Sequence, residues 1–323
     1  MGFRLRYTTF WVLDGQQLTR DRDSRASGQA GNFTKADRFR RRRRDAVSCL
    51  NRYTFCTVPT KLEEIIAATR RRIASAKESA DLRALEAAAT NHQPRGFRSS
   101  LQSAAKSGIA VIAELKKASP SKGLIRADFP VAKLAREFET AGATALSVLT
   151  DEKYFQGSLQ NLESASQVTS LPCLRKDFIV EEFQLIEARA HGADAILLIV
   201  AALDQSELKR LYQRAHDLEL DVLCEVHDAV ELQRAMDAGC ETIGVNNRNL
   251  HTFQVDLNTS LQLAELMPIG VLKVTESGIE SGDDIARLRQ VGFDAFLIGE
   301  SLMRAQSPGK ALRDLLAPSV AAP

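Results

Sequence analysis

The feature that most constrains the fold is an alternation of strand-like apolar runs with amphipathic helical runs over residues 108–316. Eight apolar runs start 21 to 33 residues apart, which leaves room for one strand, one helix and two short loops in each repeat. An open doubly wound sheet usually has fewer strands, so eight tandem units predict an α/β protein with a closed (β/α)8 TIM barrel. The expected strands are 111–115, 144–149, 171–175, 194–200, 220–226, 241–245, 271–275 and 294–298.

The segments between these strands carry helix signals of their own. Asp204 and Glu207 have the spacing of a capping box, and Leu208, Leu211 and Ala215 follow at core-facing positions. Four glycines fall between a helix and the next strand, where a left-handed cap is useful: Gly142, Gly192, Gly239 and Gly292. Further helices are expected at 131–141, 158–167, 181–190, 228–238, 258–266, 282–290 and 308–316.

The barrel is expected to carry a helical extension at its N-terminal side. Thr60 and Glu63 form a capping box that starts a helix of about four or five turns, and a second short helix is expected at 80–89. Residues 58–107 are therefore predicted to pack on the barrel as an extension containing the helices of 60–107. The predicted barrel domain is 58–323.

The first 57 residues differ from the rest in charge. They hold 13 Lys and Arg against five Asp, with a run of arginines at 40–44, and show no sustained helical or strand period, which predicts disorder. Such a segment could bind nucleic acid or an anionic membrane surface through phosphate charges. We favour a solvated tail, or translated sequence upstream of a natural start near Val58, since no methionine occurs between Met1 and Met236.

Composition excludes several other classes. No window approaches 18 consecutive apolar residues and the N-terminus lacks a signal-peptide pattern, so a cytoplasmic protein without a membrane span is expected. The cysteines, at 49, 56, 173, 224 and 240, are odd in number and lack CxxC spacing, which argues against disulfides and zinc. The histidines, at 92, 191, 216, 227 and 251, lack metal-ligand spacing and are expected to be surface or packing residues.

Charged and polar residues recur where the predicted strands end, which is where TIM barrels carry their chemistry. In IAELKKASPSKG (112–123), period-2 alternation puts Glu114 and Lys116 on the inward face with Ile112. A buried charge costs several kcal/mol unless it is paired, so packing alone does not explain the set. The residues at strand ends are Glu114, Lys116, Lys176, Glu225, Asn246, Arg248, Glu276 and Ser277.

The last two repeats add a phosphate signal. Ser277-Gly278 follows the seventh strand and Gly299-Glu300-Ser301 follows the eighth, the usual phosphate-binding loops of this architecture. Backbone amides around Gly278, Gly299, Glu300 and Ser301 are expected to hold the phosphate, with the Glu300 side chain turned away. A phosphate ester is therefore the predicted small-molecule substrate.

Together these motifs closely resemble those of the indole-3-glycerol-phosphate synthase family, in order, over residues 58–316. The resemblance is carried by IAEL-K…SPS (112–121), FQGS (155–158), RKDFI (175–179), CEVH (224–227), IGVNNRNL (243–250), TESGI (275–279) and LIGESLM (297–303). The resemblance implies a carboxy-lyase of tryptophan biosynthesis, without a metal or organic cofactor. Its reaction converts 1-(2-carboxyphenylamino)-1-deoxyribulose 5-phosphate to indole-3-glycerol phosphate, carbon dioxide and water.

The resemblance also implies roles for the residues at the strand ends. Lys176 would protonate the ketone during ring closure, and Glu225 and Glu114 would share the proton transfers of dehydration, their order being open. The departing carboxylate would be held by Lys116, with Ser119 and Arg248. Asn246, Glu276 and Ser277 would orient hydroxyl groups, and Phe155 and Phe178 would stack near the anthranilate ring.

Two alternatives stay open from the sequence. Another phosphate-binding barrel, such as phosphoribosylanthranilate isomerase, is the nearest, although that reaction calls for a cysteine and aspartate pair in place of two lysines and two glutamates. The other is a nucleic-acid binder driven by the arginines at 40–44. Deleting residues 1–57 separates the two classes, because an enzyme keeps its turnover and a binding module of that kind does not.

Overall fold

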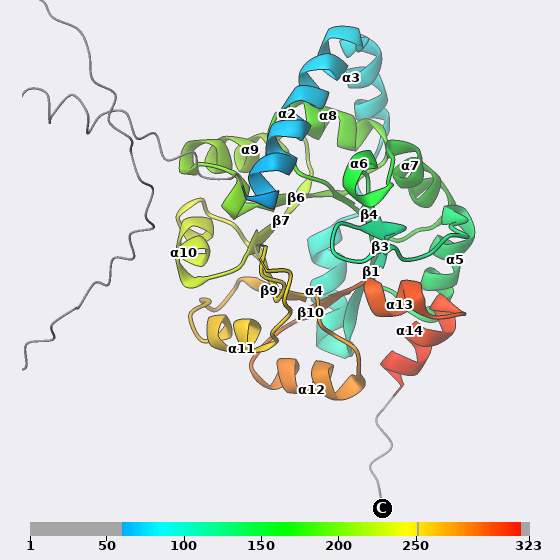
Figure 1. The fold of residues 1–323 in the computed structure, drawn as a ribbon, viewed down its shortest axis with the longest axis vertical. Helices are drawn as coiled ribbons and strands as arrows, with labels where there is room; N and C mark the ends of the chain where they lie inside the picture. Colours follow the sequence, from blue (N-terminus) through cyan, green and yellow to red (C-terminus); the bar gives the residue numbers. More distant parts are fainter. Residues whose placement is uncertain (1–59, 251, 318–323) are drawn as a thin grey trace, which may run out of the picture. The chain divides into compact units, whose positions relative to one another are not determined.

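The computed structural model describes residues 60–250 and 252–317, in which eight parallel strands close into a barrel (Figure 1). The order around the barrel is β1-β10-β9-β8-β7-β6-β5-β4, and β1 pairs with both β10 and β4. The predicted (β/α)8 barrel is confirmed, with each strand boundary within two residues of its predicted place. The strands are β1 (Ala110–Leu115), β4 (Ala145–Leu149), β5 (Cys173–Lys176), β6 (Ala195–Ile199), β7 (Asp221–Val226), β8 (Thr242–Asn246), β9 (Leu272–Glu276) and β10 (Ala295–Ile298).

Helices cover the outside of the barrel between successive strands (Figure 1). The predicted capping box forms at Asp204 and Glu207, and Leu208 and Leu211 of the following helix are buried. Gly142 and Gly292 have φ of +96° and +93°, so the predicted left-handed caps are confirmed there, as at the other two glycines. The helices are α5 (Val131–Ala141), α7 (Leu159–Val168), α8 (Phe183–Ala190), α9 (Gln205–Asp217), α10 (Ala229–Asp237), α11 (Asn258–Ala264), α12 (Gly282–Gln290) and α14 (Pro308–Leu316).

Within the described residues, three helices precede the first barrel strand: α2 (Lys61–Ser79), α3 (Leu82–Asn91) and α4 (Phe97–Ser107). The capping box predicted at Thr60 starts α2, whereas the sequence does not predict α4 as a separate helix. Phe97 and Leu101 of α4 are fully buried among inward side chains of the strands. The Arg98 amide donates to Asp221 at the start of β7. Helix α4 therefore closes the amino end of the barrel and leaves the carboxyl end open.

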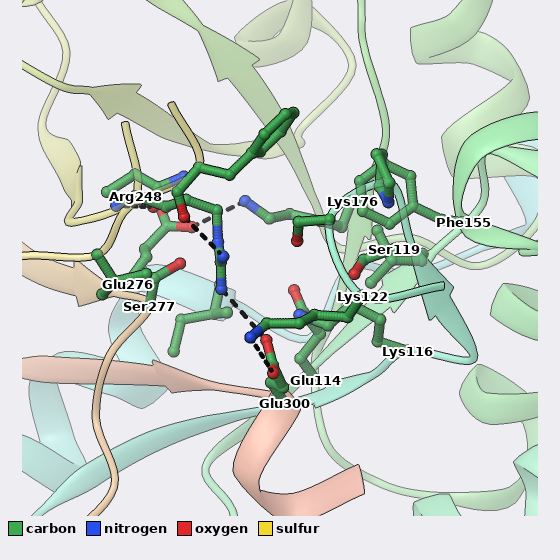
Figure 2. Close-up of a pocket in the computed structure, with 18 of the residues that line it drawn as sticks. Glu114, Lys116, Ser119, Lys122, Phe155, Lys176, Arg248, Glu276, Ser277 and Glu300 are labelled. Carbon is green, nitrogen blue, oxygen red and sulfur yellow. Dashed lines mark hydrogen bonds and ion pairs between the residues drawn. The ribbon is translucent and has the colours of Figure 1, made fainter. Parts of the chain in front are cut away.

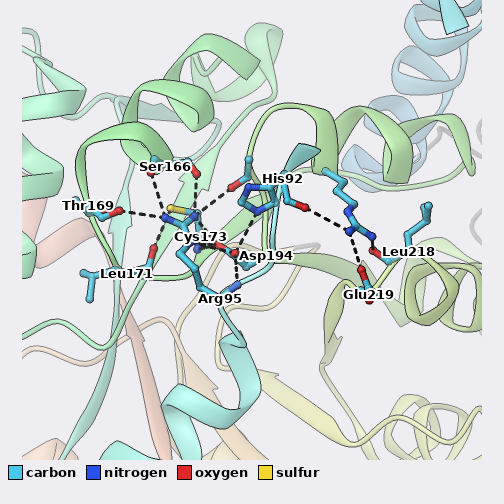
Figure 3. Close-up of polar contacts among 11 residues, drawn as sticks. His92, Arg95, Ser166, Thr169, Leu171, Cys173, Asp194, Leu218 and Glu219 are labelled. Atoms are coloured by element: carbon cyan, nitrogen blue, oxygen red, sulfur yellow. Dashed lines mark hydrogen bonds and ion pairs between the residues drawn. The ribbon is translucent and has the colours of Figure 1, made fainter. Parts of the chain in front are cut away.

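A partly buried ion-pair network fixes the segment between α3 and α4 to the same end of the barrel (Figure 3). The Asp194 carboxylate, just before β6, accepts bonds from the Arg95 guanidinium at 2.5 and 3.0 Å and from the Cys173 amide at 2.6 Å. His92 lies 3.2 Å from the same carboxylate. Burial opposes the charge, but His92 and Arg95 lower the pKa of Asp194 below its ordinary value. This network is structural, because it lies opposite the open end.

Short elements follow several strands at the open end. A small hairpin of β2 (Ala118–Ser119) and β3 (Gly123–Leu124) follows β1, and α6 (Glu152–Phe155) follows β4. A 3-10 turn, η1 (Val200–Ala202), follows β6, and α13 (Glu300–Arg304) follows β10. The sequence does not predict these elements, because helices and hairpins this short have too few residues to show a period.

The predictions about residues 1–57, Cys49, Cys56 and His251 lie outside the described residues and stay predictions. Of the cysteines inside them, Cys173, Cys224 and Cys240 are free and buried. None of the helices within the described residues has the length and apolar character to cross a membrane. In the same part of the chain, no group of three or more His, Cys, Asp or Glu side chains is arranged to hold a metal ion.

Candidate active site

A cavity of about 570 Å³ opens at the carboxyl ends of the barrel strands. Its lining combines charged side chains at the strand ends with apolar side chains from α2 and the loops. All fifteen residues that the sequence nominated line this one cavity: Glu114, Lys116, Ser119, Phe155, Lys176, Phe178, Glu225, Asn246, Arg248, Glu276, Ser277, Gly278, Gly299, Glu300 and Ser301. The period-2 alternation that turned the charges inward in the sequence thus holds in three dimensions.

Lys176, the last residue of β5, lies between two carboxylates, one from β7 and one from β9. Its Nζ atom is 2.7 Å from Glu225 Oε2 and 2.8 Å from Glu276 Oε2 (Figure 2). Burial disfavours the lysine charge, but these carboxylates outweigh it and raise the pKa of Lys176 above its ordinary value. The ammonium group is therefore charged, desolvated and held in one orientation inside the cavity.

Glu225, on β7, contacts a second cation that the sequence reasoning missed. His227 Nε2 lies 3.4 Å from Glu225 Oε1, and the other ring nitrogen of His227 lies 3.0 Å from Glu231 Oε2. Burial opposes the imidazolium, yet the two carboxylates raise the pKa of His227 to about 10. Burial likewise opposes the Glu225 charge, but Lys176 and His227 lower the pKa of Glu225 below its ordinary value. Glu225 is therefore an ionised carboxylate at neutral pH.

The signal for His227 was present in the sequence. It follows Glu225 by two residues, so the same alternation that turned Glu114 and Lys116 toward one face also relates Glu225 and His227. The sequence predicted only a surface or packing role for His227, and in the structure its side chain also pairs with a carboxylate of the cavity.

Glu276, at the end of β9, differs from Glu225 in the direction of its pKa shift. Burial is the main reason that the pKa of Glu276 rises to about 7; Lys176 opposes the rise and the Glu225 charge adds to it. Its Oε1 atom is buried and has no hydrogen-bond partner among the described residues. A Cβ at Gly244 would lie 2.3 Å from that oxygen, so the glycine makes room for it. Glu276 can therefore carry a proton near neutral pH beside an ionised Glu225.

On the opposite wall, Glu114 at the end of β1 forms an ion pair with Lys116 (Figure 2). Glu114 is 3% exposed, so its charge depends on this lysine for compensation. Gly299 makes the position available, since a Cβ there would lie 2.3 Å from Glu114 Oε1. The glycine nominated for its amide thus also has a steric function.

Arg248, in the loop after β8, is held by two oxygen atoms. Its guanidinium donates to the Phe253 carbonyl at 3.2 Å and to Glu300 Oε2 at 3.2 Å. The expectation that the Glu300 side chain turns away from the cavity is therefore wrong. The side chain lies toward Arg248 and Lys122 (Figure 2), because three cations gather there and attract the carboxylate.

The apolar wall of the cavity is formed by Phe155 and Phe178, whose ring centroids are 6.3 Å apart and tilted by 43°. Helix α2 adds Leu62 and Ile65 to the lining. The sequence shows that these two residues lie on the apolar face of a helix, but it cannot show which surface that face covers. Their contribution to the cavity was therefore missed.

A buried network supports β5 from behind the cavity. Arg175 donates to Asp177 at 3.0 Å, and Thr150 donates to the same carboxylate oxygen at 2.7 Å. Asp177 also accepts from the Phe178 amide at 2.8 Å. These bonds fix the backbone on both sides of Lys176, because they hold the side chains of the residues immediately before and after it.

The chain is similar to known proteins over most of its length. The family model described as indole-3-glycerol phosphate synthase matches residues 62–315. An indole-3-glycerol phosphate synthase of Koribacter versatilis is 60% identical over 255 residues, which cover 79% of this chain and 98% of the relative. One of Burkholderia vietnamiensis is 48% identical over 252 residues, covering 78% and 97%. A solved structure of KGPDC from Streptococcus mutans has a TM-score of 0.51 at 13% identity, covers 64% of this chain and 95% of that one, and supports the fold alone.

Proposed function

The chain belongs to the indole-3-glycerol phosphate synthase family, and from this premise we propose that its cavity closes an indole ring by a decarboxylating condensation. The substrate is 1-(2-carboxyphenylamino)-1-deoxyribulose 5-phosphate, and the products are indole-3-glycerol phosphate, carbon dioxide and water. The observation that carries the proposal is Lys176 held between Glu225 and Glu276 inside the cavity.

Ring closure is assigned to Lys176 as the general acid. When the aryl carbon attacks the ketone carbon, the ketone oxygen becomes far more basic than an amine and takes a proton from the ammonium group. The charged donor of the lysine is already desolvated and oriented by two carboxylates, so little reorganisation is needed at that moment.

Loss of carbon dioxide restores the aromatic ring. Lys116, Ser119 and Arg248 hold the carboxylate before it departs, through charge-assisted hydrogen bonds that fix its plane relative to the ring. The C–C bond breaks, its electron pair returns to the ring, and neutral carbon dioxide leaves. Phe155 and Phe178 pack against the apolar ring and keep water away from it.

Dehydration removes the hydroxyl group formed from the ketone. Lys176 and His227 keep Glu225 ionised, so it is present in the form that can accept a proton. Glu276, whose pKa is about 7, is suited to donate one to the leaving hydroxyl, and Glu114 lies on the opposite wall as the second carboxylate for transfer. The pKa of Glu225 is lowered and that of Glu276 is raised, and this difference gives the two neighbouring carboxyl groups different roles.

Binding is assigned to the remaining residues. Asn246 and Ser277 orient the hydroxyl groups of the chain, and the amides near Gly278, Gly299, Glu300 and Ser301 hold the phosphate. Binding energy from the phosphate, which does not react, positions the carbons that do.

The test is direct conversion of the carboxyphenylamino substrate, followed by the fluorescence of the indole product. Wild-type protein should produce it, and Lys176→Ala should not at a measurable rate, whereas Lys310→Ala on an exposed helix should match wild type. Absence of product with folded wild-type protein would reject the proposal.

We also propose that the protein acts in the cytoplasm and that residues 1–57 are dispensable for turnover. The described helices include none suited to crossing a membrane, and the cavity residues all lie between Lys61 and Arg304. A protein lacking residues 1–57 should keep its kcat. If it instead loses activity, or if the full chain binds duplex DNA with strong salt dependence, the N-terminal segment has a function that this proposal omits.

A further inference from the structure

Three cations from three separate segments meet at one carboxylate on the rim of the cavity. Glu300 Oε2 lies 3.2 Å from Arg248 Nη2, and Glu300 Oε1 lies 3.2 Å from Arg304 Nε and 3.8 Å from Lys122 Nζ. Lys122 lies in the turn of the β2-β3 hairpin and Arg248 in the loop after β8 (Figure 2). Arg304 is the last residue of α13. We call Lys122, Arg248 and Arg304 the cation cluster.

The cation cluster is not neutralised by Glu300. Three positive charges face a single negative one, so the cluster retains an attraction for a further anion. Arg248 and Glu300 are the less exposed pair, with 21% and 24% of their side chains accessible, and their contact is screened less than the others. The Glu300 carboxylate is thus paired with the Arg248 guanidinium, the group that an incoming anion would bind.

Glu300 is also the first residue of α13, and its amide is among those to which phosphate binding is assigned. Its amide and its carboxylate therefore have opposite effects on a phosphate at this wall: the amide donates a hydrogen bond, and the carboxylate repels a dianion. Relieving that repulsion requires the side chain to leave the cation cluster. The Cα–Cβ and later bonds of glutamate rotate between staggered positions, so the departure needs no change in the backbone.

We propose that Glu300 is an internal anion that holds the cation cluster in the free protein and is displaced when an anionic group of the substrate binds. The residue then acts in specificity. A free phosphate ion has only its own contacts with which to displace Glu300, whereas the full substrate adds its ring, hydroxyl and carboxylate contacts. The displacement costs both ligands the same free energy, but only the substrate has further contacts that offset it, so inorganic phosphate is left with weak binding. The inference rests on the function proposed above for the identity of the substrate.

The test measures binding of inorganic phosphate to the full chain by isothermal titration calorimetry at fixed ionic strength and without substrate. Three proteins are compared: wild type, Glu300→Gln, and Glu280→Gln as the matched control. Glu280 lines the same cavity and loses the same charge on substitution, but among the described residues it forms no ion pair with the cation cluster. Glu300→Gln should bind phosphate about fivefold more tightly than wild type, and Glu280→Gln should stay within about twofold.

Each outcome of the titration either supports or overturns the proposed role of Glu300. Unchanged or weaker phosphate binding by Glu300→Gln overturns the inference, and equal tightening in both variants replaces it with a general effect of charge at the rim. Adding Arg248→Gln to Glu300→Gln should abolish the gain, since the freed guanidinium is its source. Because the measurement needs no turnover, an inactive protein that shows the gain would count against the proposed function and leave the inference standing.

Discussion

The ammonium group of Lys176 lies 2.7 Å from the carboxylate of Glu225 in the lumen of the barrel, where Glu225 is buried and 12% of the Lys176 side chain is exposed. Neither charge would be stable there alone, because a buried ion without a partner costs several kcal/mol. The pair therefore keeps Lys176 protonated and Glu225 ionised, which are the states that an acid and a base need before reaction.

Removing either member should remove most of the turnover. Lys176→Ala and Glu225→Gln are each expected to lower kcat by about two orders of magnitude or more, with a smaller change in KM, because the general acid–base contribution is made in the transition state. Steady-state kinetics with circular dichroism as a folding check would measure this. Full kcat in both variants would mean that the roles lie elsewhere.

Glu276 should set the alkaline limb of the pH profile. The raised pKa of about 7 means that its carboxyl is protonated below that pH and loses the proton above it. If it donates a proton, kcat/KM of the free enzyme should fall as the pH rises through about 7. In Glu276→Gln, which cannot ionise, this limb should disappear and the remaining activity should be lower. A limb that persists at the same pH in that variant belongs to another group.

His227 should act through Glu225 as a positioning residue. Its imidazolium lowers the pKa of Glu225, so His227→Asn should raise that pKa and move the acidic limb of kcat/KM to higher pH. We expect a loss of about tenfold in kcat, with Glu231→Gln changing the profile in the same direction. His216→Asn, on α9, is the control. A purely structural role for His227 would lower stability without moving the limb.

Gly299 should be intolerant of a side chain. Gly299→Ala places a Cβ 2.3 Å from Glu114 Oε1, so the Glu114–Lys116 pair must move. A displacement of about 1 Å in a catalytic group costs up to about a hundredfold in rate, and we expect a loss of at least about tenfold in kcat. Gly108→Ala is the matched control, because a Cβ added there would meet no other part of the chain within 4 Å and the φ of Gly108 is −177°.

The network around Asp194 at the amino end of the barrel should contribute to stability and not to catalysis. Asp194→Asn leaves Arg95 without its anion, and we expect a loss of about 3 kcal/mol in the free energy of unfolding. Asp314→Asn, in an exposed pair with Lys310, should cost less than about 0.5 kcal/mol. Urea denaturation measures both, and equal small losses would show that Asp194 contributes little.

The pH dependence of that contribution follows from the direction of the shift. The pKa of Asp194 is lowered in the folded protein from 3.8, so its contribution is fully present above about pH 4 and is lost as the pH falls through the folded value. The stability difference between wild type and Asp194→Asn should therefore shrink in acid.

The sequence predicted the barrel because apolar residues in each repeat recur first with a period of two and then with a period near 3.6. These periods are properties of a single strand or helix and do not depend on how the neighbouring elements are arranged. It predicted Glu114, Lys176 and Glu225 because the carboxyl ends of parallel strands meet at one rim. It could not predict where Glu300 points, since that direction depends on cations brought together from three loops. It also missed α4 as the closure of the barrel, because the burial of Phe97 exists only once the strands surround it.

The two carboxylates that grip Lys176 come from β7 and β9, with β8 between them, so one cation links strands that do not pair with each other. The strands at this rim are therefore held together by ion pairs, in a position where a barrel without a catalytic site would have packed apolar side chains. Neutralising the lysine would leave two anions facing one another in the lumen, and the protein would relieve that stress by taking up a proton. A variant chosen to abolish turnover should thus also resist unfolding better in mild acid than at neutral pH.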